Sequence, residues 1–100
     1  MVDENRLAEL RAQQSALKKL LEGRGWAELK RALEEQIRGR RQRIFGLEFK
    51  GIEDLSELLR TRGEIAGLLL AIQMPELMLE DLREDIQQML EEDREEKENE

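Results

Sequence analysis

The stretch "DLSELLRTRGEIAGLLLAIQ", residues 54–73, predicts one helix of the pair around which the protein is built. Its Asp54 and Glu57 form the pattern of a capping box, which predicts a helix start near Asp54. Apolar side chains occur on more than one side of this helix, and a helix that is apolar nearly all round is expected to be the most buried one. One set of these side chains is Leu55, Leu59, Ala66 and Leu69, and the other is Leu58, Ile65, Leu68 and Ile72.

Small residues recur every four positions in the same stretch, at Gly63, Gly67 and Ala71. A glycine inside a helix costs about 1 kcal/mol relative to alanine, so two of them call for a packing reason. We expect Gly63 and Gly67 to allow close approach of another helix or of Trp26. A ligand niche lined by glycine is the alternative.

Before this stretch, a narrow apolar seam runs along residues 4–22. Its members alternate in steps of three and four, which is typical of one strand of a two-stranded coiled coil. A polar residue within such a seam weakens packing but can fix the register. Because a thin seam needs a second helix to bury it, we expect at least one of the flanking helices, residues 4–22 or 76–92, to find its partner in another subunit. The seam consists of Leu7, Leu10, Gln14, Leu17 and Leu21.

Glycines separate this seam from the next helix. Gly23 and Gly25 are helix-stop residues, and the apolar pattern restarts out of phase at Trp26. We expect a turn or sharp bend at the glycines and a helix over residues 25–45. Trp26, the only tryptophan, is expected to anchor a core or an interface.

The predicted architecture is an antiparallel pair of helices, residues 25–45 and 54–73, with flanking helices over 4–22 and 76–92. Pro75 cannot continue a helix without loss of a hydrogen bond, but it suits the first turn of a new one. Residues 1–92 are therefore expected to form one helical domain. The acidic composition of residues 93–100 is typical of either a fraying helix end or a disordered tail.

Composition supports an all-α protein with coiled-coil-like association. The chain has 100 residues, of which 41% are charged and 3% aromatic, and it is rich in strong helix formers. A chain of this length buries a limited core, and association with other chains commonly makes up the deficit. The net charge of -7 argues against nonspecific nucleic-acid binding by the domain as a whole.

Residue types that carry catalysis are scarce. The chain has no histidine and no cysteine, so the commonest general base and the best nucleophile are both absent. We expect no enzyme activity, no cofactor, no metal site and no small-molecule substrate, although composition alone does not exclude a magnesium site built from carboxylates. The longest apolar run, residues 65–72, is too short to span a membrane. The acidic start lacks an apolar leader region, so secretion is not expected.

Four arginines lie within "QIRGRRQRIF", residues 36–45, at Arg38, Arg40, Arg41 and Arg43. They do not share one helical face, and the nearby aromatic Phe45 is expected to pack against the protein. A solvated helix end, a contact with an acidic protein surface and a nucleic-acid contact are the three interpretations, in that order of preference. The acidic tail, of the same chain or of a neighbouring copy, is one such acidic surface.

The layout of residues 25–80 resembles small helical proteins encoded in the structural gene clusters of tailed bacteriophages. The resemblance is carried by Gly25–Trp26, Arg62–Gly63–Glu64 and Pro75–Glu76. It implies a role in the virion or its morphogenesis through helix-mediated contacts. It also implies a location in the cytoplasm of a bacterial host or in the virion.

These observations predict a non-enzymatic helical assembly protein that forms a homo-oligomer and contacts other structural proteins. A second hypothesis is a regulatory adaptor or inhibitor that binds a host protein and uses its acidic tail as a charge mimic. A third is a small nucleic-acid-associated protein that acts through Arg38–Arg43.

Overall fold

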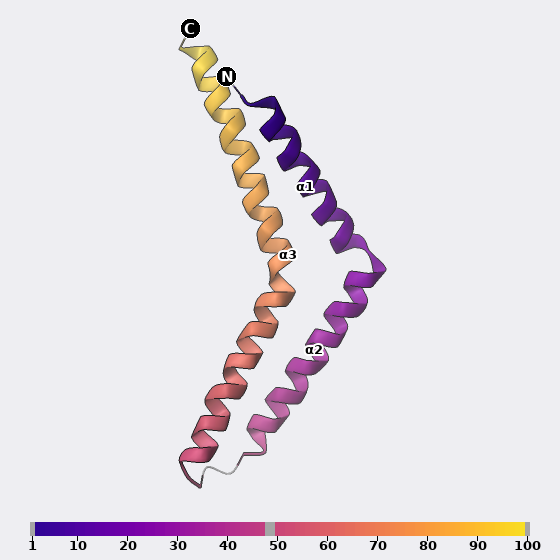
Figure 1. Ribbon diagram of the computed structural model, residues 1–100, viewed down its shortest axis with the longest axis vertical. Coiled ribbons are helices and arrows are strands. Elements are labelled where there is room, and N and C mark those ends of the chain that lie inside the picture. Colours follow the sequence, from indigo (N-terminus) through magenta and orange to yellow (C-terminus); the bar gives the residue numbers. More distant parts are fainter. Residues whose placement is uncertain (1, 48–49, 100) are drawn as a thin grey trace. The chain divides into compact units, whose positions relative to one another are not determined.

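The computed structural model describes residues 2–47 and 50–99 and contains three helices (Figure 1). They are α1 (Glu4–Glu22), α2 (Arg24–Phe45) and α3 (Ile52–Glu98). No strand occurs in these two ranges, and the predicted all-α class is confirmed. Residues 1, 48, 49 and 100, which the predicted domain and tail include, lie outside the described residues. Among the helices described, none is both long enough and apolar enough to cross a membrane.

The chain divides into two compact units, and each unit pairs two antiparallel helical segments (Figure 1). The terminal unit consists of Met1–Gly23 and Pro75–Glu100, so α1 lies beside the second half of α3. The central unit is Arg24–Met74, in which α2 lies beside the first half of α3. The predicted antiparallel pair is the central unit.

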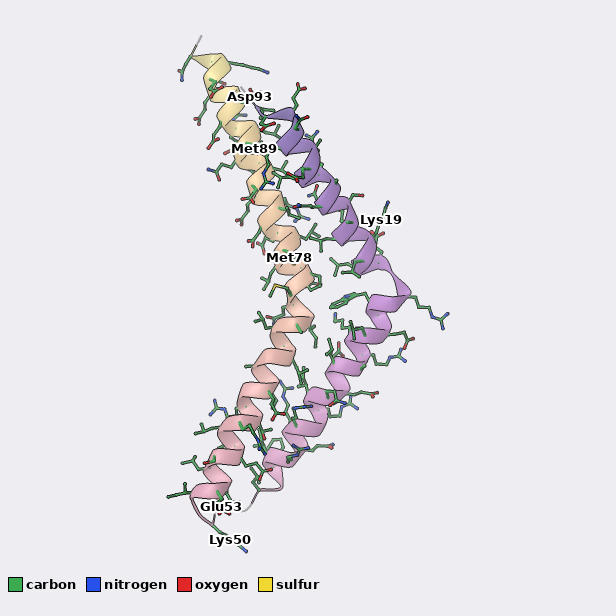
Figure 2. The ribbon with its side chains drawn as sticks, in the orientation of Figure 1. Lys19, Lys50, Glu53, Met78, Met89 and Asp93 are labelled. Atoms are coloured by element: carbon green, nitrogen blue, oxygen red, sulfur yellow. The ribbon has the colours of Figure 1, made fainter. Side chains whose placement is uncertain are left out.

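In the terminal unit, α1 packs against the second half of α3, and each helix contributes a seam of side chains spaced three and four residues apart. On α1, Leu7 and Leu10 are buried, with 9% and 2% of their surface exposed. Near the start of α1, the backbone N–H of Val2 donates a hydrogen bond to Oδ1 of Asp93 across 3.0 Å (Figure 2). The half-buried seam on α3 consists of Leu79, Leu82, Ile86, Met89 and Asp93.

The central unit repeats this arrangement around Ile37, which has 4% of its surface exposed. Burying one such side chain contributes about 2 kcal/mol. Thr61 of α3 is fully buried in this unit. The half-buried side chains around them are Trp26, Lys30, Leu33, Arg40 and Ile44 on α2, and Leu58, Ile65, Leu68 and Ile72 on α3.

Two helix boundaries after Met74 differ from the prediction. Pro75 does not separate two helices, because α3 continues through it from Ile52 to Glu98. A proline inside a helix removes one backbone hydrogen bond and clashes with the preceding turn. Each half of α3 packs on a different partner helix, and this packing offsets the local cost. The helix also extends beyond residue 92 to Glu98, so of the two alternatives for the acidic segment the helix end is the one observed.

The other helix ends have identifiable causes. Asp3 caps α1, since its side chain accepts hydrogen bonds from the backbone N–H groups of Asn5 and Arg6, both at 3.1 Å. A single extended residue, Gly23, separates α1 from α2, which confirms the predicted interruption. α3 begins two residues before the predicted start. Asp54 instead reaches back to the backbone N–H of Lys50 across 2.8 Å.

Candidate interaction surface

The first half of α3 carries an apolar stripe that no segment of the described chain covers, which we call the open stripe. Leu59 is two residues from the buried Thr61, so on a helix of 3.6 residues per turn it lies on the opposite side. The same offset separates Leu70 from Ile72. The prediction that this helix is the most buried one is therefore wrong, because only one of its two apolar faces packs on α2. The open stripe consists of Ile52, Leu55, Leu59, Leu70 and Met74, with 83%, 51%, 59%, 49% and 41% of their surface exposed.

The small residues lie on or beside this open stripe. A Cβ atom added to Gly63 or to Gly67 would have no described neighbour within 4 Å. Neither Trp26 nor another helix of the described chain therefore makes the close approach that was predicted. Close contact with a different chain stays a prediction, as does the role of the half-buried Trp26 as an interface anchor.

The four arginines divide into two groups: Arg40 is half-buried, and Arg38, Arg41 and Arg43 are exposed. Arg40 is part of the packed face of α2, and its Nε donates to Oε2 of Glu64 on α3 across 2.7 Å. Its Nη1 also donates to the carbonyl and side-chain oxygens of Gln36, at 3.3 and 2.8 Å. The hydrogen bond from Nε of Arg40 is the main reason that the pKa of Glu64 lies below its ordinary value. The positive charges of Arg40, Arg60 and Arg43 lower this pKa further. Arg40 is thus engaged within the central unit.

Arg38 and Arg41 form no ion pair among the described residues. They border a groove of about 550 Å³ between α2 and α3, whose apolar walls include Ile37, Leu69 and Ile72. Phe45 lines the same groove but has 88% of its surface exposed, so the expectation that it packs against the protein is wrong. Phe45 lies in the last turn of α2, where too few neighbours surround it to bury a large ring. An exposed aromatic ring beside two unpaired arginines is therefore part of the candidate surface.

The N-terminal seam meets a helix of its own chain. The second half of α3 packs against α1 in the terminal unit, and a contact of either flanking helix with another subunit stays a prediction. Two members of the seam are buried and three are half-buried against this segment. The buried members are Leu7 and Leu10, and the half-buried ones are Gln14, Leu17 and Leu21.

Two features of the central unit were not predicted: the burial of Thr61 and the pairing of Arg40 with Glu64. The hydroxyl of Thr61 is fully buried and has no hydrogen-bond partner among the described residues. The pairing of Arg40 with Glu64 joins residues that are 24 positions apart, so local spacing gave no signal for it. The position of Thr61, three to four residues from Leu58 and Ile65, does place it on the packed face.

Among the described residues, no group of three or more acidic side chains is placed to hold a metal ion. Comparison with known proteins adds no relative: no family model matches the chain, and neither a curated protein nor a solved structure is significantly similar to it. The proposed function therefore depends on the exposed apolar and charged side chains described above.

Proposed function

We propose that this chain is a non-enzymatic helical assembly protein, completed by another chain along the open stripe. The observation that supports this most strongly is the exposure of five large apolar side chains on one face of α3. Large apolar side chains that are exposed together on one helix face are typical of an interaction site. An amphipathic helix of the partner would lie along the stripe and bury it.

The setting that we propose is the virion or morphogenesis machinery of a tailed bacteriophage, where such contacts hold subunits together. Homo-oligomerisation and contact with other structural proteins both fit an apolar surface that occupies a single helix face. Gly63 lies in the middle of the stripe, and an absent side chain there lets a partner backbone approach closely.

The stripe is tested with the variant Leu55→Gln/Leu59→Gln, which keeps helix propensity and removes apolar surface. We expect the unaltered chain to have a mass above 11.8 kDa by light scattering, and the variant to have a lower average mass with unchanged helix content. Ser56→Gln is the control, because it adds a glutamine to α3 without removing an apolar side chain. A variant whose mass equals that of the unaltered chain would remove the stripe from the proposal.

The adaptor and nucleic-acid hypotheses are tested on the same sample. Retention on heparin that is lost in the variant Arg38→Gln/Arg41→Gln would favour nucleic-acid binding. A chain that stays monomeric but captures one purified host protein would favour the adaptor.

A further inference from the structure

The terminal unit has a groove between α1 and α3 with an apolar floor and an acidic rim. The groove has a volume of about 540 Å³, and we call it the acidic groove. Asp81 and Asp85 of α3 are exposed on its rim, and among the described residues neither makes a hydrogen bond or an ion pair. Met78, labelled in Figure 2, lines the groove one turn before Asp81. The floor consists of Ala16, Leu17 and Leu82, with Gln13 beside them.

The central unit has a row of side chains with the opposite charge, Arg38, Arg41 and Phe45, which we call the arginine row. Steps of three and four residues place all three on one side of α2. Neither arginine is paired within the described chain, and Phe45 is 88% exposed. Aromatic and arginine side chains are the types most often found at the energetic centre of protein interfaces.

The two surfaces match in spacing as well as in charge. With a rise of about 1.5 Å per residue, Arg38, Arg41 and Phe45 lie at about 0, 4.5 and 10.5 Å along α2. Read in the opposite direction along α3, Asp85, Asp81 and Met78 lie at about 0, 6 and 10.5 Å. An antiparallel approach therefore brings each arginine near an aspartate and the Phe45 ring near the Met78 thioether. Thioether sulfur atoms make favourable contacts with aromatic rings.

We propose that the arginine row of one copy of the chain docks into the acidic groove of a second copy. Charge complementarity and the matched spacing identify a second copy as the occupant, because both halves of the contact are present on every chain. Since the two surfaces belong to different units, a copy can offer its row to one neighbour and its groove to another. Such contacts build rings or filaments unless two copies exchange them reciprocally. This self-association goes beyond the proposed function, because it does not use the open stripe.

Charge reversal on each side, followed by mixing, tests the contact. Variant A is Arg38→Glu/Arg41→Glu, and variant B is Asp81→Arg/Asp85→Arg. Each variant alone places like charges on its row and its groove, so we expect a lower average mass than that of the unaltered chain in sedimentation at low salt. In an equimolar mixture, the acidic row of A meets the basic groove of B, and the basic row of B meets the acidic groove of A. We therefore expect the mixture to regain the mass that each variant lost.

The matched control is Glu80→Arg/Glu84→Arg, which has the same spacing and charge change as variant B but lies outside the groove lining. It should keep the mass of the unaltered chain. Circular dichroism confirms that every variant is folded. An unaltered chain that is monomeric would overturn the proposal, as would folded variants that keep their association or a mixture that does not regain it. Loss of mass in the stripe variant alone, with A and B unaffected, would overturn this contact and leave the proposed function standing.

Discussion

Arg40 of α2 and Glu64 of α3 join the two helices of the central unit through a hydrogen bond of 2.7 Å between Nε and Oε2. Glu64 also lies 3.8 Å from Nε of Arg60, one turn earlier on its own helix. Because both arginines favour the ionised carboxylate, the pKa of Glu64 is lower in the folded chain than its ordinary value of 4.5.

The pH dependence of stability follows from this lowered pKa. The unfolded chain binds a proton to Glu64 more readily, so the stabilisation is present above the ordinary pKa and is lost as the pH falls through the lowered one. We expect Glu64→Gln to lower the free energy of urea unfolding at neutral pH and to have no effect at strongly acidic pH. Glu35→Gln, which removes an exposed carboxylate from α2, is the control. An equal effect of Glu64→Gln at both pH values would contradict this account.

The unsatisfied hydroxyl of Thr61 predicts a stabilising substitution. Thr61→Val keeps the shape of the side chain and removes a buried polar group that has no partner. We expect the free energy of unfolding to rise by about 1 kcal/mol. Thr61→Ser, which keeps the hydroxyl and leaves a methyl-sized void, should instead be less stable. A loss of stability in Thr61→Val would show that the hydroxyl has a partner after all.

The cap of α1 predicts a loss of stability confined to the terminal unit. Asp3→Ala removes the acceptor for the N–H groups of Asn5 and Arg6 and should cost about 1 kcal/mol. Asp3→Ser supplies a replacement acceptor and should retain most of the stability. Hydrogen exchange of the amides in the first turn of α1 measures the difference directly. Equal exchange in the two variants would mean that the cap does not stabilise this turn.

Gln14 is the polar member of the α1 seam and is half-buried. Replacing it with leucine should add apolar burial and raise the free energy of unfolding by about 1 kcal/mol, at the cost of a less well-defined register. Gln13→Leu is the matched control, because Gln13 is exposed and its replacement should change stability by less than about 0.5 kcal/mol. Thermal unfolding of the two variants gives the comparison, and a larger gain at Gln13 would contradict the assignment of the seam.

The seams could be predicted from the sequence because three-four spacing is a local property of the chain. Leu7 and Leu10 were identified in this way, as was the helix pair built around Ile37. Spacing did not identify the helix that packs against the α1 seam. The expectation of a helix start at Pro75 missed the continuity of α3, and spacing alone does not say that the second half of α3 packs on α1. A proline inside a helix destabilises it locally, and tertiary packing can offset this loss of stability. The sequence pattern around a proline indicates the loss but not the packing.

The candidate surface was harder to predict, because it depends on which side chains are covered or paired by other helices. All four arginines were identified from composition, yet only pairing across helices distinguishes Arg40 from Arg38 and Arg41. The two-sided apolar pattern of residues 54–73 indicated burial, but the chain supplies just one partner helix for it. Leu59 and Phe45 are exposed because the fold places too few neighbouring side chains around them. The spacing of apolar residues along one helix does not give the number of these neighbours.

Pro75 has one more consequence for how the chain moves. A proline nitrogen carries no hydrogen, so the carbonyl of Ala71 lacks its usual helical donor at the point where the two compact units divide. Fraying that starts in one half of α3 therefore reaches a position without a backbone hydrogen bond before it reaches the other half. Although α3 is one helix along the sequence, we expect its two halves to open and close as separate events.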